Sequence, residues 1–217
     1  MGRAIPRVMV YVEEQTDRWL GNESNTFFGV GVVGAGNLQH GATTTYEGYY
    51  NSAFGYQALY NVTTGYYNSA FGCSTLYSNT TGHSNSVFGY TALYSNTTGY
   101  LNAAFGRNVL YSNTTGDNNS AFGSSALYAN TTGYYNSAFG VNALVTNTTG
   151  YLNSAFGYNS LYSNTFGYLN SAFGGNTLSS NTTGSYNAAL YEPSVLPRRA
   201  LSPNAELLTP SVLPRRA

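Results

Sequence analysis

A 17-residue phrase repeats eight times over residues 51–186, without insertion or deletion. Its first copy, residues 51–67, reads NSAFGYQALYNVTTGYY. A constant period indicates one backbone unit stacked on itself. The unit is too short for a pair of helices, and its Gly, Asn and Thr residues favour turns over helix. We therefore expect an all-β fold, a parallel β-solenoid (β-roll) in which each copy forms one turn of the solenoid, or rung.

The periodicity divides the chain into three parts. Residues 25–50 begin and end like the phrase but carry nine extra residues, so they are interpreted as a degenerate first rung. The last part contains the octapeptide PSVLPRRA twice, and its prolines predict an extended tail. The predicted boundaries are an N-terminal cap or attachment segment at 1–24, a solenoid array at 25–190 (degenerate rung 25–50, clean rungs 51–186, partial rung 187–190) and a C-terminal tail at 191–217.

Positions in a copy are numbered from its initial Asn, and positions 2–4 and 8–10 form short apolar runs that predict two extended segments per rung. In a parallel stack, equal positions on consecutive rungs lie about 4.8 Å apart and form columns, or ladders. Phe at position 4 and Leu at position 9 are the predicted core, and Ala at position 3 points the opposite way from Phe. The predicted core ladder comprises Phe54, Phe71, Phe88, Phe105, Phe122, Phe139, Phe156, Phe173, Leu59, Leu76, Leu93, Leu110, Leu127, Leu144, Leu161 and Leu178.

Asn occupies position 1 in every copy. Stacked side-chain amides can hydrogen-bond along a ladder, and we expect each one to donate to the next rung and to accept from the preceding one. The predicted Asn ladder is Asn51, Asn68, Asn85, Asn102, Asn119, Asn136, Asn153 and Asn170.

Charge is scarce: 7% of the residues are charged, the formal net charge is zero, and the clean rungs contain only Arg107 and Asp117. Without a basic stripe to neutralise phosphates, a nucleic-acid partner is not expected. The first residues show no apolar stretch long enough for a secretory signal or a transmembrane span, so no classical signal peptide and no membrane insertion are expected. The single Cys73 cannot form a disulfide framework within one chain.

Catalytic chemistry finds little support in the repeat. His40 and His83 are the only histidines, each stands alone in the sequence, and Ser, His and Asp are not available together as a triad. Neither a calcium-binding glycine–aspartate repeat nor a zinc-type Cys/His cluster occurs. We therefore expect no enzyme activity, no metal and no cofactor.

The phrase NSAFGxxALYSNTTG resembles the left-handed parallel β-roll repeats in the heads of trimeric autotransporter adhesins, and it is also similar to repeat arrays of phage tail-fibre proteins. The resemblance covers about residues 25–190. It implies a left-handed solenoid, a tendency of three chains to associate side by side, and a role in fibres and adhesins that have no catalytic residues.

Tyrosine recurs at position 10 and at positions 16 and 17. Exposed tyrosines suit contacts with sugars or proteins, whereas the plainer interpretation is stacking between rungs and packing between subunits. The candidate surface-binding residues are Tyr66, Tyr67, Tyr100, Tyr134, Tyr135, Tyr151 and Tyr168.

Sequons of the form N-x-T recur at one turn of the repeat. They are either glycan acceptors or simply turn residues, and the absence of a recognisable secretory signal favours the second interpretation. The candidate glycosylation sites are Asn61, Asn79, Asn96, Asn113, Asn130, Asn147 and Asn181.

These features predict a structural subunit of a self-associating fibre or filament, located on a virion or outside a cell, with an adhesive role. The expected partner is the chain itself, as a homotrimer or filament, with a cell-surface glycan or protein as a further partner. One alternative is a glycan-binding module that uses the tyrosine-rich face. Another is an ice-binding solenoid, because Thr fills position 13 in every copy and position 14 in all but the copy with Phe166.

Overall fold

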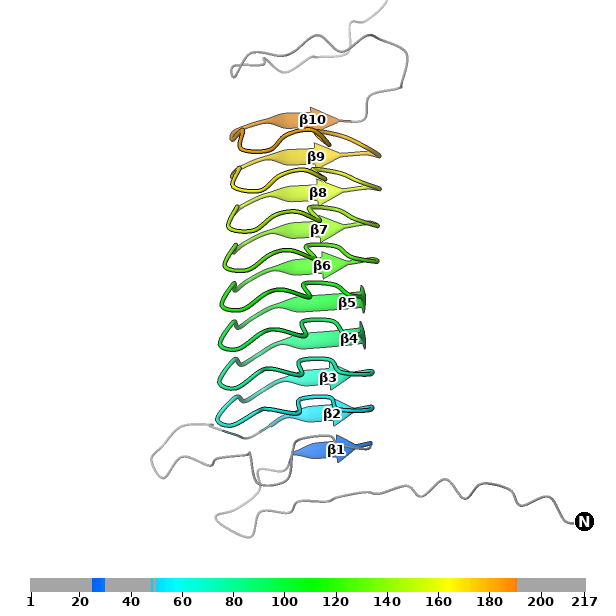
Figure 1. The fold of residues 1–217 in the computed structure, drawn as a ribbon, viewed down its shortest axis with the longest axis vertical. Coiled ribbons are helices and arrows are strands. Elements are labelled where there is room, and N and C mark those ends of the chain that lie inside the picture. The colour runs from blue at the N-terminus through cyan, green and yellow to red at the C-terminus, as the bar shows by residue number, and fades with distance from the viewer. Residues whose placement is uncertain (1–24, 30–47, 49, 191–217) are drawn as a thin grey trace, which may run out of the picture.

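The computed structural model describes residues 25–29, 48 and 50–190, and the predicted segments 1–24 and 191–217 lie outside the described residues. Within that part the regular structure is all β, a single parallel sheet of ten strands in chain order (Figure 1). The strands are β1 (Thr26–Phe28), β2 (Ser52–Phe54), β3 (Ser69–Phe71), β4 (Ser86–Tyr90), β5 (Ala103–Arg107), β6 (Ser120–Phe122), β7 (Ser137–Phe139), β8 (Ser154–Phe156), β9 (Ser171–Phe173) and β10 (Ala188–Leu190).

Each strand pairs with its counterpart one repeat further along the chain. Ser69 is opposite Ser52 and Ser86 is opposite Ser69, so that equal positions always face each other. Strand β1, at the start of the predicted degenerate rung, joins in the same register, with Thr26 opposite Ser52, whereas residues 30–47 and 49 of that rung lie outside the described residues. The predicted parallel β-solenoid with 17-residue rungs is therefore confirmed, whereas its left-handed sense stays a prediction.

Each rung contains one strand rather than two. Positions 8–10, predicted to be extended, form a turn because the Leu at position 9 adopts a left-handed backbone with φ between 50° and 53°. The residues at positions 7 and 17 are also left-handed, as Gln57 and Tyr67 illustrate with φ values of 53°. Each non-glycine residue in this region costs about 1–2 kcal/mol. That cost is offset at position 9, because the turn directs the Leu side chain inward.

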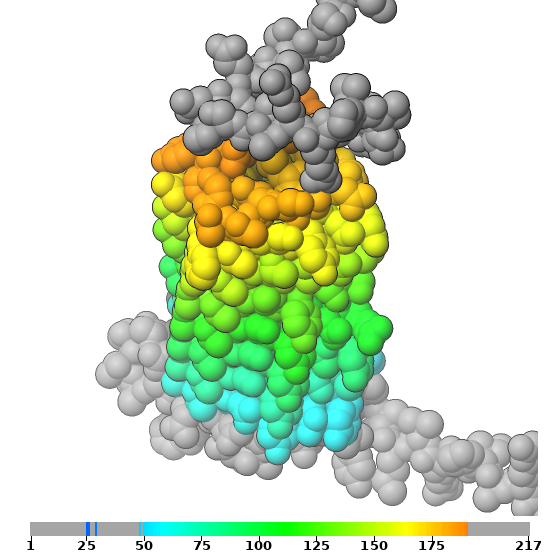
Figure 2. Space-filling model, turned by 45° about the horizontal axis from the view of Figure 1, so that its top comes forward, coloured from blue at the N-terminus to red at the C-terminus, as the bar shows by residue number. Residues whose placement is uncertain are grey.

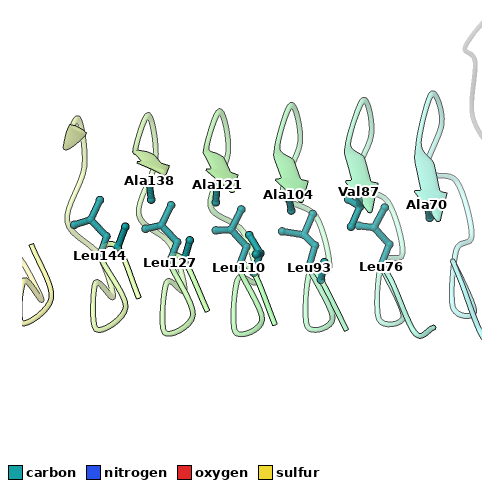
Figure 3. Packing of buried hydrophobic residues seen from close by; sticks show 14 of the residues in the cluster. Ala70, Leu76, Val87, Leu93, Ala104, Leu110, Ala121, Leu127, Ala138 and Leu144 are labelled. Atoms are coloured by element: carbon teal, nitrogen blue, oxygen red, sulfur yellow. The ribbon is translucent and has the colours of Figure 1, made fainter. Parts of the chain in front are cut away.

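The apolar interior consists of one leucine and two small side chains per rung. The leucines from Leu59 to Leu161 are fully buried, and Leu178 in the last rung packs partly against them. Figure 3 shows five of these leucines, from Leu76 to Leu144, directed toward the strands, from which Ala70, Val87, Ala104, Ala121 and Ala138 point inward. The residue at position 8, such as Ala92, completes the cluster.

The prediction that the phenylalanines belong to the core is wrong. Alternate residues of a strand point to opposite faces, and Ala at position 3 takes the inward direction. Phe at position 4 therefore lies on the outer side of the sheet, with exposed fractions of 49% for Phe54 and 41% for Phe88 and Phe173, while the other five rings of the column are half-buried. The rung encloses too little space for an aromatic ring beside the leucine, so the smaller side chain is inside.

The predicted Asn ladder is present inside the rod. Asn68 donates from Nδ2 to Oδ1 of Asn51 at 3.1 Å, so each amide donates to the preceding rung, opposite to the direction expected from sequence. The second Nδ2 hydrogen goes to the carbonyl of Gly82 at 2.9 Å. The Oδ1 of Asn68 in turn accepts hydrogen bonds from both the backbone N–H and the Nδ2 of Asn85. All four hydrogen-bonding positions of the amide are thus used.

Glycine at position 15 lets this polar interior close. A Cβ on Gly82 would lie 2.5 Å from the carbonyl oxygen of Gly99 and 2.3 Å from Oδ1 of Asn79. Both distances are shorter than van der Waals contact allows, so only glycine can occupy the position without displacing the ladder.

Candidate functional site

The candidate sites of this molecule are the ladders on its outer surface. Because the rungs stack into one continuous column (Figure 2), each outward position becomes a stripe along the rod. Three stripes are aromatic: the phenylalanines at position 4, the tyrosines at position 10, and the aromatic residues at positions 16 and 17.

The phenylalanine stripe is the one that no rung interrupts. Neighbouring rings from Phe71 to Phe173 are stacked, with centroids 4.6–5.1 Å apart and interplanar angles of 2–10°. The Phe54–Phe71 pair at one end is looser, at 6.3 Å. The position 2 residues lie on the same face of the sheet and are small, Ser in most rungs and Ala at Ala103. We call these two columns together the sheet face.

The position 10 stripe is shorter. Tyr60, Tyr77, Tyr94, Tyr111 and Tyr128 form four consecutive stacked pairs with centroids 5.0–5.2 Å apart. Val145 then ends the stack, and Tyr162 lies beyond it. Burial, followed by the neighbouring phenols of Tyr77 and Tyr111, raises the pKa of Tyr94.

Positions 16 and 17 form what we call the tyrosine edge, and the seven candidate surface-binding tyrosines all lie there. They fall into two runs. In the first run, His83 is stacked between Tyr66 and Tyr100, with centroids at 4.6 and 4.9 Å. In the second run, Tyr151 is stacked between Tyr134 and Tyr168. The position 17 tyrosines meet these stacks edge-on, as in the Tyr66–Tyr67 and Tyr134–Tyr135 pairs.

Asp117 separates the two runs of the tyrosine edge. A hydrogen bond from Tyr100 to the Asp117 carboxylate, followed by the charge of that carboxylate, raises the pKa of Tyr100. Asn118 also donates to Oδ2 of Asp117, at 2.7 Å. Burial lowers the pKa of His83. The tyrosine edge therefore includes a direct contact between a phenol and a carboxylate, Tyr100 with Asp117.

Most candidate glycosylation sites lie inside the rod, where a glycan could not be attached without displacing the fold. Asn79, Asn96, Asn113, Asn130 and Asn147 are fully buried at position 12. They form a second Asn ladder, in which Asn96 Nδ2 donates to Oδ1 of Asn79 and to the carbonyl of Gly99. The nitrogen that would carry a glycan therefore uses both of its hydrogens in the folded rod.

The two remaining sequons lie at the ends of the array. Asn181 continues the second ladder and donates to Oδ1 of Asn164 and to the carbonyl of Gly184. Asn61 is half-buried at position 11, because Val62 takes position 12 in that rung. Sequence reasoning missed this ladder, although Asn164 occupies position 12 where Phe166 abolishes the sequon. That persistence of Asn without a sequon was the available signal for a structural role.

The threonine pair does not present two exposed ranks. The hydroxyl of Thr80 at position 13 donates to the carbonyl of Thr97 on the next rung at 3.1 Å, and the other position 13 threonines repeat this bond. Position 14 is the exposed one from Thr81 onward. A single file of exposed threonines is a poor match to the flat array expected of an ice-binding surface.

Neither a metal centre nor a membrane-spanning helix is found in the described residues. No three His, Cys, Asp or Glu side chains gather there in a group that could hold an ion. The same residues include no helix that is long and apolar enough to cross a bilayer. Cys73 is a free, half-buried thiol, 3.7 Å from the hydroxyl of Ser74.

Comparison with known proteins gives no match among family models, curated protein sequences or solved structures. The architecture is therefore established by the structure as a parallel β-solenoid of 17-residue rungs.

Proposed function

We propose that the protein is a non-enzymatic structural subunit that associates side by side with copies of itself into a fibre or filament, on a virion or outside a cell, where it has an adhesive role. The phenylalanine ladder is the observation that carries this proposal. It places a stacked aromatic stripe outside the fold, along all eight clean rungs.

An exposed stripe of this kind stabilises a contact more than it stabilises the monomer. Stacking already protects the two flat faces of most rings, so the edges are what a partner would cover. Contiguous apolar stripes on a protein surface mark interaction sites. A partner that follows the stripe must have the same rung spacing, and a second copy of the chain meets this condition at every rung.

The sparse charge of the rod supports the same conclusion. The two columns of the sheet face contain no charged residue: Asp117 lies at position 16, and Arg107, the last residue of β5, is exposed at the border of the face, two residues after Phe105. Two such faces can approach without burying an unpaired charge, which would otherwise cost several kcal/mol.

Sedimentation velocity and electron microscopy of the purified chain at micromolar concentration test the proposal. The wild type should form dimers or larger side-by-side assemblies. Replacing Phe105 and Phe122 by Ser should weaken association at least about tenfold, as expected for central interface residues. Tyr162→Ser is the matched control, because Tyr162 is an exposed ring at position 10, in the turn and away from the strand. A wild-type chain that stays monomeric at all these concentrations would contradict the proposal.

A glycan-binding role for the tyrosine edge is a second candidate. Its support is the pairing of stacked and edge-on rings at Tyr134 and Tyr135, with exposed fractions of 37% and 54%. Tyrosine rings with accessible hydroxyls suit sugar faces. Selective hits on a glycan array that disappear in Tyr134→Ser/Tyr135→Ser would support this role, and an array without selective hits would remove it.

A further inference from the structure

We infer that two copies pair in parallel through their sheet faces, with the phenylalanine column of each copy seated in the small-residue column of the other. This inference rests on the proposed self-association and specifies the geometry of one pair; a two-fold contact closes on itself, so growth of a fibre from such pairs uses a further contact outside the sheet face. The pairing follows from the order of small and large residues across the face.

The sheet face has a ridge and a furrow. The ridge is the Phe column at position 4. The furrow is the adjacent column at position 2, consisting of Ser52, Ser69, Ser86, Ala103, Ser120, Ser137, Ser154 and Ser171. Alternate residues of a strand lie about 6.6 Å apart on one face, so ridge and furrow run side by side along the rod.

The lateral order of ridge and furrow selects the orientation of the pair. A two-fold axis parallel to the rod reverses the strand direction and places the ridge of each copy over the furrow of the other. The rods then point the same way. A two-fold axis parallel to the strands keeps the lateral order, so that ridge meets ridge and furrow meets furrow. Close packing between sheets requires large residues to interdigitate with small ones, which favours the parallel pair.

The size of the contact sets the expected strength. Eight rungs at about 4.8 Å give a strip roughly 38 Å long, and the two columns give a width of roughly 12 Å. The pair would therefore bury about 900 Å² in total, slightly below the roughly 1,000 Å² that a stable specific interface exceeds, as expected of a weak, reversible contact. We expect a reversible pair whose population rises with concentration over the micromolar range.

Filling the furrow tests the seating of the ridge. Ser120→Phe with Ser137→Phe adds apolar surface to the face but removes the space for the partner's ring. Ridge-in-furrow packing predicts association at least about tenfold weaker than wild type in sedimentation equilibrium. Ser120→Ala with Ser137→Ala is the matched control, since Ala103 already occupies this column, and should associate like wild type. Circular dichroism establishes that each variant keeps its fold.

Spin-label distances test the orientation. Labels are attached to Cys at Thr81, Thr132 or Thr183, three exposed position 14 residues on rungs near the start, middle and end of the array, in a Cys73→Ser background. A parallel pair gives the same inter-copy distance at all three sites. In an antiparallel pair with all eight rungs overlapping, the two end labels are offset by five and seven rungs, roughly 24 and 34 Å along the rod, and the middle label by one rung, so the end distances exceed the middle one.

The outcomes separate the inference from the proposal beneath it. A wild-type chain that never self-associates overturns both. Self-association that survives filling of the furrow, unequal distances at the three labels, or a trimer in sedimentation overturns the parallel pair alone and leaves the fibre proposal standing.

Discussion

The two asparagine ladders are buried and the phenylalanine ladder lies on the surface, the reverse of what the polarity of these side chains alone would predict. The Asn residues at positions 1 and 12 are almost completely buried, with 1% exposure at Asn51 and none at Asn113. The Phe residues are outside, with 49% exposure at Phe54. In most folded proteins, Phe is among the residues most often buried and Asn is mostly exposed.

The difference shows that, in a rung this small, the need to satisfy backbone hydrogen bonds determines which side chains are buried. The turn carbonyl of Gly82 faces inward and needs donors, which Asn68 and Asn79 supply at 2.9 Å. A buried carbonyl without a partner costs about 1–3 kcal/mol. The phenylalanine side chains form no hydrogen bonds to the backbone, so they are available for contacts between molecules.

The most damaging change should be the removal of one amide from the position 1 ladder. In Asn119→Ala, the buried Asn136 loses the acceptor of its backbone N–H (3.0 Å) and of its Nδ2 (3.2 Å). Two orphaned donors should lower the free energy of unfolding by about 4 kcal/mol, measured by urea denaturation. Ser120→Ala, at a position where Ala103 shows that Ala is accepted, should change it by less than about 0.5 kcal/mol. Similar losses from both variants would refute the structural role of the ladder.

Paired truncations inside and outside the rung sharpen the comparison. Leu110→Ala removes a fully buried side chain and should cost about 3 kcal/mol. Phe88→Ala removes a larger side chain, but one that is 41% exposed and held by stacks of 4.6 and 5.1 Å, and should cost about 1.5 kcal/mol. Urea denaturation of dilute, monomeric protein gives both values. A greater loss from Phe88→Ala would place the phenylalanines back in the core.

The two asparagine ladders should differ from each other. Asn113→Val removes the acceptor of one Asn130 amide hydrogen, whereas Gly116 keeps its donor from Asn102. The fully buried Val62 shows that this position accepts an apolar residue. A loss of about 1 kcal/mol is expected in the same denaturation assay. A loss equal to that of Asn119→Ala would mean that the two ladders contribute equally.

The sequence was sufficient to predict the stacked 17-residue rung, but not which side chains of a rung are inside and which are outside. An unbroken period predicted parallel stacking, and an invariant Asn predicted an amide ladder, because both depend only on the repeat. Alternation along the strand placed Ala53 and Phe54 on opposite faces without saying which one was inside. That choice depends on the space enclosed by the rung, which is set by the left-handed turn at Leu59. The sequons concealed the second ladder, because N-T-T matches both a glycan acceptor and a buried amide followed by a turn.

The smallest predicted effect concerns the tyrosine edge. There the interaction tested is between a surface phenol and a carboxylate, not the packing of buried side chains. Asp117→Asn removes the carboxylate that raises the pKa of Tyr100, so that pKa should fall toward the ordinary value of tyrosine. Because the raised pKa favours the neutral phenol in the folded state, its contribution to stability is present at neutral pH and is lost as the pH rises through the folded-state pKa. Asp117→Asn removes this contribution, so stability at neutral pH should fall, but only slightly, because the pair lies on the surface. The titration itself, followed by NMR of ring-labelled tyrosine, is therefore the measurement. Tyr151 is the internal control, since burial and neighbouring phenols raise its pKa, and it should not respond. An unchanged titration at Tyr100 would show that the Asp117 carboxylate does not raise its pKa. The tyrosine edge would then lack the electrostatic interaction that distinguishes it from the uncharged sheet face.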